Sequence, residues 1–339
     1  MRIPEFLKEN GTIGFVAPSY GCNIEPYKSA FDHAQDILKQ RGYRLLSGPN
    51  CYEGKGIGIS NEPKLCGAEL NDFFAKKDVD VILSCGGGEL MCEVLDHVAF
   101  EQIASEEPKW YMGFSDNTNM TFLLTTLCDT ASVYGPCAPA FGMEPWYASV
   151  EDAMLLLEGK KHIFMGYPKW EKESKKDEEH PLEPYYLTQD RILVKVPDQD
   201  SKMRGRILGG CLDCLGKLVG TGYDKVKEFN QKYAKDGIIW YFEACDLNVM
   251  DIRRTLWQLD HAGWFEQAKG FLVGRPLCFG EELFGLNQYD AVTGVLSKYH
   301  VPIIMDLDIG HIPPMMPMIN GVLADVTVQE NVIQIAYQF

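Results

Sequence analysis

Residues 109–118 read KWYMGFSDNT, an aromatic and apolar run that leads into Ser115. Asp116 and two further polar residues follow, and residues 120–127 are again largely apolar. This pattern predicts a strand that runs directly into a helix, with Ser115 on the turn between them. Free N–H groups and the helix dipole favour negative charge at such a turn, which suits a nucleophile. The alternative is that Ser115 and Asp116 only cap the helix.

Short apolar runs alternate with helical patterns on both sides of this stretch. We expect strands at residues 11–19, 43–46, 79–84 and 110–114, and helices at residues 27–41, 65–75 and 89–104. The alternation predicts a parallel sheet with helices on both faces and right-handed crossovers.

Ligands bind beyond the carboxyl ends of the strands in such sheets, and the triple glycine Gly86, Gly87 and Gly88 lies there together with Ser115. The glycines would bring backbone N–H groups close to whatever the serine attacks. The alternative is a flexible turn, because the run matches neither a dinucleotide-binding fingerprint nor a P-loop.

The composition changes after residue 159. Residues 165–190 are charged, contain prolines and lack a periodic pattern, which is typical of a linker or a lid. We therefore expect an α/β domain over residues 1–165, a linker or lid loop over 166–200 and a second domain over 201–339. Beyond residue 190, strands are expected at residues 192–196, 204–208, 237–242, 270–273, 302–305 and within 322–335, and helices at 211–218, 251–265 and 290–299.

Charge and cysteine content exclude several classes of partner. The net charge of −16 argues against binding to nucleic acid or to an anionic membrane, and no apolar stretch reaches the roughly 20 residues that span a bilayer. The eleven cysteines are scattered and the first residues lack the apolar core of a signal peptide, so we expect a cytoplasmic protein. Cys211 and Cys214 form an isolated CxxC, and neither a metal nor a cofactor is predicted.

Three reactive side chains each follow a predicted strand: Ser115, Glu243 and His311. Serine hydrolysis needs a hydroxyl, an imidazole that takes its proton, and a carboxylate that orients and stabilises the imidazole. These three residues supply that set. Sequence spacing does not show that they meet, and the alternative is that the glutamate and the histidine are structural.

Six segments carry a resemblance that covers almost the whole chain. They are GTIGFVAPS (11–19), the glycine turn (86–88), PKWYMGFSDNT (108–118), ILGGCLDCLGKLVGT (207–221), IIWYFE (238–243) and DIGHIPP (308–314). In these segments the chain resembles the LD-carboxypeptidases of peptidase family S66. That family cleaves an L,D-peptide bond in cytoplasmic muropeptides or, in the microcin C immunity branch, an amide in an aminoacyl-nucleotide analogue.

The resemblance implies an amino-terminal flavodoxin-like domain, a smaller β-rich carboxyl-terminal domain, an active site in the interdomain cleft and a homodimer. It implies Ser115 as the nucleophile with Glu243 and His311 as its partners. The backbone N–H groups of Asp116 and Gly87 would form the oxyanion hole, and Gly86 and Gly88 would contact the substrate.

The chain departs from the family pattern at several positions, and this leaves the substrate open. Ser84 and Cys85 stand where many members have an arginine before the glycine turn, Cys211 replaces a frequent asparagine, and Ile312 replaces the usual glycine after the histidine. Trp170 resembles the loop aromatic that stacks on a nucleobase in the immunity branch. The alternative for Trp170 is packing of the loop onto the body of the protein.

The sequence leaves three hypotheses for the function. Release of D-alanine from murein tetrapeptide would require a group that binds the terminal carboxylate, for which the candidates are Arg204, Arg206, Arg253 and Arg275. The second reading is hydrolysis of an aminoacyl-nucleotide amide. A third, from another class, is a small-ligand binding protein without catalysis.

Overall fold

The computed structural model describes residues 1–339, and the chain divides into two compact units. The first unit consists of Met1–Lys161 and Glu173–Tyr186, and the second of His162–Lys172 and Leu187–Phe339. Strand β6 (Ile163–Met165) belongs to the second unit because it pairs with β18 (Val332–Gln338). Residues 166–200, expected as a linker or lid, are therefore divided between both units.

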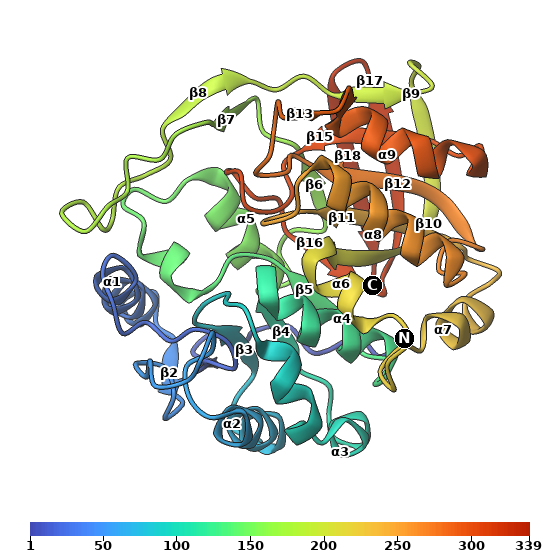
Figure 1. The fold of residues 1–339 in the computed structure, drawn as a ribbon. Coiled ribbons are helices and arrows are strands. Elements are labelled where there is room, and N and C mark those ends of the chain that lie inside the picture. The colour runs from blue at the N-terminus through green and yellow to red at the C-terminus, as the bar shows by residue number, and fades with distance from the viewer. The chain divides into compact units, whose positions relative to one another are not determined.

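A parallel sheet forms the centre of the first unit, coloured blue to green in Figure 1. The order of its strands is β2-β1-β3-β4-β5, and every neighbouring pair is parallel. This is the flavodoxin-like order, in which ligands bind near the point where the winding reverses between β1 and β3. The strands are β1 (Thr12–Val16), β2 (Arg44–Ser47), β3 (Val81–Ser84), β4 (Trp110–Gly113) and β5 (Ser132–Tyr134).

Helices cover this sheet through regularly spaced apolar side chains. Helix α1 buries Ala30, Ala34 and Leu38, whose spacing of four residues places them on one face. Strands β1, β3 and β4 are buried along their whole length, as expected for parallel strands covered on both faces. The helices are α1 (Tyr27–Gln40), α2 (Pro63–Ala75), α3 (Phe100–Ser105), α4 (Thr118–Thr126) and α5 (Ala148–Leu157), with 3₁₀ segments η1 (Met91–His97), η2 (Ser115–Asn117) and η3 (Ala138–Gly142).

The prediction of a single helix over residues 89–104 was wrong. The segment forms the 3₁₀ helix η1, and α3 starts only at Phe100. Val98 between them is extended, and the N–H of Ala99 donates to Oδ1 of Asn71 on α2 at 2.8 Å. A side-chain acceptor from a neighbouring helix thus takes a backbone donor that a continuous helix would use internally.

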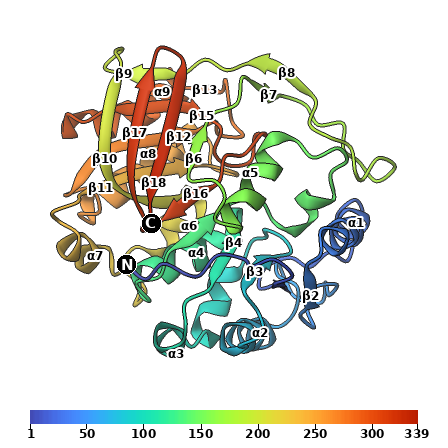
Figure 2. The ribbon, with the colours of Figure 1, turned by 180° about the vertical axis from the view of Figure 1, so that it is seen from behind.

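An eight-stranded mixed sheet forms the centre of the second unit, in the order β6-β18-β17-β10-β11-β12-β15-β9. The four strands β10, β11, β12 and β15 are mutually parallel, and antiparallel strands flank them on both sides. Figure 2 shows β17 and β18 as neighbouring long strands. The further strands of this sheet are β9 (Val194–Val196), β10 (Ser201–Cys211), β11 (Ile238–Glu243), β12 (Ala268–Gly274), β15 (Ile303–Leu307) and β17 (Leu323–Gln329).

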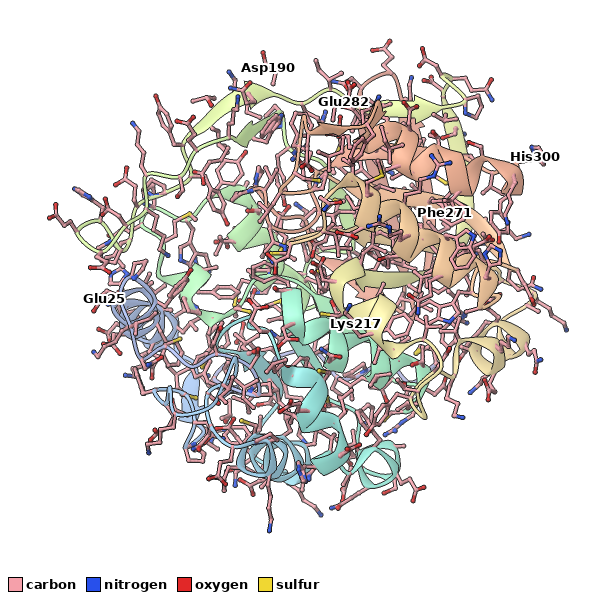
Figure 3. The ribbon with its side chains drawn as sticks, in the orientation of Figure 1. Glu25, Asp190, Lys217, Phe271, Glu282 and His300 are labelled. Atoms are coloured by element: carbon pink, nitrogen blue, oxygen red, sulfur yellow. The ribbon has the colours of Figure 1, made fainter.

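Aromatic side chains fill the core of the second unit. Phe271, labelled on β12 in Figure 3, is fully buried, and its ring centroid lies 5.3 Å from that of Phe265 and 5.8 Å from that of Tyr299. Asn248 caps α8, since its Oδ1 accepts from the N–H groups of Met250 and Asp251. The helices are α6 (Leu212–Leu218), α7 (Val226–Lys232), α8 (Val249–His261), α9 (Gln288–Leu296) and the 3₁₀ segment η4 (Ser297–Tyr299).

Short strands complete the second unit. Residues 165–190, expected as a linker or a lid, contain two short strands, since β7 (Lys169–Glu171) and β8 (Leu187–Asp190) form an antiparallel pair. Gly209 and Gly210 lie within β10, since both pair with β11, and the helix expected over residues 211–218 follows as α6. The remaining strands are β13 (Glu282–Leu283), β14 (Leu286–Asn287) and β16 (Met318–Asn320). None of the helices is sufficiently long and apolar to span a membrane.

Candidate active site

Ser115 lies on a sharp turn between β4 and α4, as the sequence predicted. Its φ is +63°, in the left-handed region that residues other than glycine rarely adopt, and its side chain is only partly buried. Nucleophilic serines of hydrolases occupy such a strained strand-to-helix turn, because it exposes the hydroxyl above the sheet. The backbone at Ser115 is therefore more unusual than capping of a helix requires.

Hydrogen bonds from neighbouring loops hold the turn in place. The N–H of Ser115 donates to Oη of Tyr134 at the end of β5, with 2.9 Å between the atoms. Nδ2 of Asn117 donates to the carbonyl of Gly86 at 2.7 Å and to that of Phe114 at 3.1 Å. The serine turn and the glycine turn are thus joined directly through Asn117.

The carboxylate of Asp116 is buried and connects three other segments to the serine turn. Its Oδ2 accepts from Oγ of Ser19 at 2.6 Å and from the N–H of Met91 at 2.9 Å, and its Oδ1 accepts from Nδ2 of Asn119 at 3.0 Å. The side chain of Asp116 therefore orders the loops that follow β1 and β3. The oxyanion role of its backbone N–H remains a prediction.

The glycine turn lies against the serine. A Cβ built on Gly87 would be 2.9 Å from Cβ of Ser115 and 3.0 Å from its Oγ, so a side chain at this position would collide with the hydroxyl group. The carbonyl of Gly87 accepts from the N–H of Tyr20 at 2.7 Å. A Cβ on Gly88 would be only 2.1 Å from Oγ of Ser19, and one on Gly86 would be 2.8 Å from the carbonyl oxygen of Tyr20. Close approach of these loops requires all three glycines.

Glu243 and His311 meet within the second unit. Glu243 is the last residue of β11, and its Oε2 lies 2.8 Å from Nδ1 of His311. The glutamate is 1% exposed. Burial of His311 disfavours its charged form, but the charge of Glu243 and hydrogen bonds with Cys245 and Glu243 outweigh burial, so the pKa of His311 lies well above its usual 6.5. The pair has the geometry of a carboxylate that orients and stabilises a basic imidazole.

The loop that carries His311 is anchored by a buried ion pair. Asp308 and Arg275 are each 1% exposed and are joined through Oδ1 and Nη2. Oδ2 of Asp308 also accepts from the N–H of Tyr167 at 2.6 Å, and Nη1 of Arg275 donates to the carbonyl of Asp306 at 2.6 Å. Because a buried charge is costly without partners, these contacts restrict where the loop can lie.

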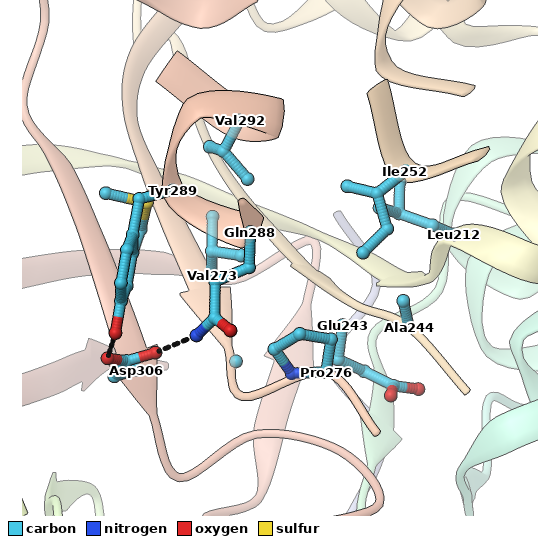
Figure 4. A pocket seen from close by; sticks show the side chains of 12 residues that line it. Leu212, Glu243, Ala244, Ile252, Val273, Pro276, Gln288, Tyr289, Val292 and Asp306 are labelled. Atoms are coloured by element: carbon cyan, nitrogen blue, oxygen red, sulfur yellow. Dashed lines mark hydrogen bonds between the residues drawn. The ribbon is translucent and has the colours of Figure 1, made fainter. Parts of the chain in front are cut away.

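A small cavity of about 20 Å³ lies beside Glu243 in the second unit (Figure 4). It is lined mainly by apolar side chains, and its polar lining residues are Glu243, Gln288, Tyr289 and Asp306. Oη of Tyr289 donates to Asp306 at 2.6 Å and Nε2 of Gln288 donates to it at 3.3 Å. This cavity is far below the several hundred Å³ of a ligand pocket and does not enter the proposed chemistry.

Trp170 is packed within the second unit, with 7% of its surface exposed. Its ring centroid lies 5.1 Å from that of Phe279 and 5.2 Å from Cζ of Arg275, and its Nε1 donates to the carbonyl of Asp190 at 3.2 Å. These contacts match the packing alternative for this residue. Its predicted role in substrate binding would require a face of the ring that these neighbours leave accessible.

The four arginine candidates all have partners within the second unit. Arg204 forms an exposed ion pair with Asp325, and Arg206 forms a more buried one with Asp236; both contacts are 2.7 Å. Nη1 of Arg253 donates to the carbonyl of Asp290 at 3.1 Å. With Arg275 bound to Asp308, a terminal carboxylate would have to compete with an existing partner of Arg204, Arg206 or Arg275.

The structure thus brings the predicted residues together in two groups. The first unit holds Ser115, Asp116 and the glycine turn, and the second holds Glu243, His311 and Trp170. Sequence reasoning assigned no role to the side chains of Tyr134 and Ser19, which contact the serine turn. Ser19 follows a strand and was open to the same inference as Ser115, but nothing in the pattern around Tyr134 indicates its contact. No group of three or more His, Cys, Asp or Glu side chains is arranged to hold a metal ion.

Comparison with known proteins gives a consistent result. The microcin C7 self-immunity protein MccF of Escherichia coli is 24% identical over 341 residues, which cover 98% of this chain and 95% of that protein. A structure of MccF in complex with glutamyl sulfamoyl guanosine aligns with a TM-score of 0.83 at 22% identity, over 99% of this chain and 98% of the other. The MccF-like protein of Bacillus anthracis str. Ames aligns with a TM-score of 0.83 at 21% identity over the whole of both chains.

Two family models also match, one for each half of the protein. Residues 13–135 match the LD-carboxypeptidase N-terminal domain, and residues 204–326 match the LD-carboxypeptidase C-terminal domain. These ranges contain Ser115 and the glycine turn in the first case, and Glu243 and His311 in the second. The chain therefore belongs to the LD-carboxypeptidase family, peptidase family S66.

Proposed function

We propose that the protein is a serine peptidase in which Ser115, His311 and Glu243 hydrolyse an amide bond. The observation that carries this proposal is the contact of 2.8 Å between Oε2 of Glu243 and Nδ1 of His311, because a serine hydroxyl is a weak nucleophile without an oriented base. The left-handed backbone of Ser115 supports the assignment of the nucleophile. The proposal requires a domain arrangement in which the imidazole reaches the hydroxyl.

In the proposed mechanism, Nε2 of His311 removes the proton of Ser115 as its Oγ attacks the amide carbonyl. Glu243 holds the imidazole through Nδ1 and stabilises the imidazolium that forms. The N–H groups of Asp116 and Gly87 stabilise the oxyanion of the tetrahedral intermediate. His311 then protonates the leaving amine, and water, deprotonated by the same imidazole, hydrolyses the acyl-enzyme.

We propose murein tetrapeptide as the first substrate candidate, with the terminal D-alanine as the leaving group. The family to which the chain belongs is described by LD-carboxypeptidase activity, which supports this choice. The proposal includes a cytoplasmic homodimer, whose mass can be measured by sedimentation equilibrium.

An aminoacyl-nucleotide amide is the second candidate. Similarity to MccF over 98% of the chain supports it, together with the MccF complex that contains glutamyl sulfamoyl guanosine. The departure from the family pattern before the glycine turn, where Ser84 and Cys85 stand, keeps this second candidate open.

One experiment tests both candidates. The parent protein, Ser115→Ala and the exposed control Ser105→Ala are incubated separately with murein tetrapeptide and with glutamyl sulfamoyl adenosine, and the products are followed by mass spectrometry. We expect turnover of one substrate by the parent and by Ser105→Ala, and none by Ser115→Ala. Equal turnover by Ser115→Ala would reject the nucleophile, and lack of turnover by the parent would favour a binding protein without catalysis.

A further inference from the structure

Ser115 needs an external support for its backbone. A serine with φ of +63° is held in a sparsely populated conformation, which persists only when the surroundings fix it. The turn has several such contacts, but most of them involve Asp116 and Asn117. The hydrogen bond from the N–H of Ser115 itself goes to a side chain, Oη of Tyr134.

Tyr134 is well placed to act as a rigid support. It is the last residue of β5, and its backbone pairs in parallel with Gly113, two residues before the serine. The side chain is fully buried, and its ring packs edge-on against that of Phe114 with 6.3 Å between the centroids. The phenol oxygen is therefore positioned by the sheet rather than by a loop.

The hydrogen bond between Ser115 and Tyr134 also affects the orientation of the serine. Because the phenol oxygen accepts from the N–H of Ser115, it orients the peptide plane that precedes Cα of the serine. That plane and φ together decide the direction of the Cα–Cβ bond, from which Oγ extends. A Cβ on Gly87 would be only 3.0 Å from this Oγ, so the glycine turn lies against the hydroxyl on that side.

From these contacts we propose that Tyr134 is a positioning residue that keeps Ser115 in its reactive conformation. This inference rests on the proposed function, because it assigns Tyr134 a role through the nucleophile. Tyr134 itself neither exchanges protons with the substrate nor contacts the reacting atoms in this role. Loss of its hydroxyl should slow acylation while substrate binding by the other loops is retained.

The test compares the parent with Tyr134→Phe, which removes one oxygen atom and keeps the ring. Turnover of murein tetrapeptide and of glutamyl sulfamoyl adenosine is measured, and kcat and KM are determined for the substrate that the parent hydrolyses. We expect kcat to fall about 10- to 100-fold, the range for a small misplacement of a reacting group, while KM changes less than about threefold. In addition, amide hydrogen exchange of Ser115 should become faster.

Tyr43→Phe is the matched control. It also removes a tyrosine hydroxyl that is hydrogen-bonded in the first unit, to Oε1 of Glu158, but Tyr43 directly precedes β2, which does not neighbour β5 in the sheet. We expect parent-like kcat for this variant. If Tyr134→Phe is folded and its kcat equals that of the parent, the positioning role is rejected, even if exchange of the Ser115 amide is faster. If KM rises and kcat is unchanged, the role is likewise rejected.

Failure of the proposed function gives a different result. In that case neither substrate is turned over by the parent in a way that depends on Ser115, and the positioning role falls with the nucleophile. A parent that needs Ser115 for turnover and a fully active Tyr134→Phe would instead reject the positioning role alone. If Tyr134→Phe does not fold, amide hydrogen exchange of the parent takes its place. The N–H of Ser115 should exchange slowly, since Oη of Tyr134 accepts from it, and a Ser115 N–H that exchanges at the rate of an exposed amide would reject the positioning role.

Discussion

Gly310 makes room for the carboxylate of Glu243. A Cβ built on Gly310 would lie 2.4 Å from Oε2 of the glutamate, the same oxygen that contacts Nδ1 of His311 at 2.8 Å. Gly310 also has a φ of +99°, which other residues rarely adopt. The residue before the histidine therefore has to be a glycine for two separate reasons.

We expect Gly310→Ala to lose activity by at least about tenfold in kcat/KM, since it would push the glutamate away from the imidazole. The change should also destabilise the protein by about 1–2 kcal/mol through the backbone strain alone. Gly220→Ala is the matched control, because Gly220 has a φ of +77° and nothing within 4 Å of its Cβ position. Parent-like kcat/KM in Gly310→Ala would contradict the role of the glutamate–histidine contact.

The activity should depend on pH through His311. Its imidazole accepts a proton only when neutral, and its pKa is raised well above 6.5, chiefly by Glu243 acting against burial. The charged form therefore persists to higher pH, and kcat/KM should increase as pH rises above 6.5 and level off only when His311 is neutral. A pH–rate profile in which activity is already constant above pH 6 would contradict this expectation.

The pH dependence of kcat/KM should change in the variant Glu243→Gln. Removal of the negative charge should move the acidic limb of the profile to lower pH and reduce the plateau value of kcat/KM, because the imidazolium loses its stabilising partner. The glutamine keeps the size of the side chain. An unchanged acidic limb would show that another group controls it.

Gly87→Ala should abolish most of the activity without unfolding the protein. Its new Cβ would be 2.9–3.0 Å from Cβ and Oγ of Ser115, so the hydroxyl has to move. We expect a loss of about 100-fold in kcat, because the oxyanion donor and the nucleophile are both displaced. Gly222→Ala, which has nothing within 4 Å of its Cβ position, is the control. Turnover of Gly87→Ala at the parent rate would exclude this glycine from the site.

The buried carboxyl group of Glu69 should make stability depend on pH. Burial raises its pKa from 4.5 to about 7, although the N–H groups of Ala17 and Asn50 oppose this shift by donating to it. Between these two pH values the folded state holds more protons than the unfolded state, so stability falls as pH rises. The difference between the two pKa values corresponds to a change of about 3 kcal/mol in the free energy of unfolding.

Glu69→Gln isolates this effect, because glutamine cannot ionise. The free energy of unfolding is measured in urea at pH 5 and at pH 8. From pH 5 to pH 8, the parent should lose up to about 3 kcal/mol more than Glu69→Gln loses. The exposed Glu107→Gln should show no comparable gain. A stability difference between Glu69→Gln and the parent that is the same at both pH values would contradict the raised pKa.

Much of the fold follows from local patterns. The apolar runs at β1, β3, β4 and β11 were identified because buried parallel strands are continuously apolar, and the spacing of apolar residues identified α1 and α8. The same approach failed at residues 89–104, where Asn71, distant in sequence, interrupts the helix, and at β7 and β8, whose charged residues carry no periodic pattern.

In the candidate site, too, local patterns predicted some features and missed others. The sequence alone determined that Ser115 lies where a strand meets a helix, and that three glycines lie at the same edge of the sheet. Strand ends and turns can be recognised in this way because they depend on residues that are neighbours in the sequence. Only the tertiary structure decided that Glu243 contacts His311, that Tyr134 accepts from the N–H of Ser115, and that Trp170 and Arg275 are packed together. These contacts join residues 19 to 105 positions apart, and their formation depends on how strands pair and side chains fill the core, which no local pattern specifies.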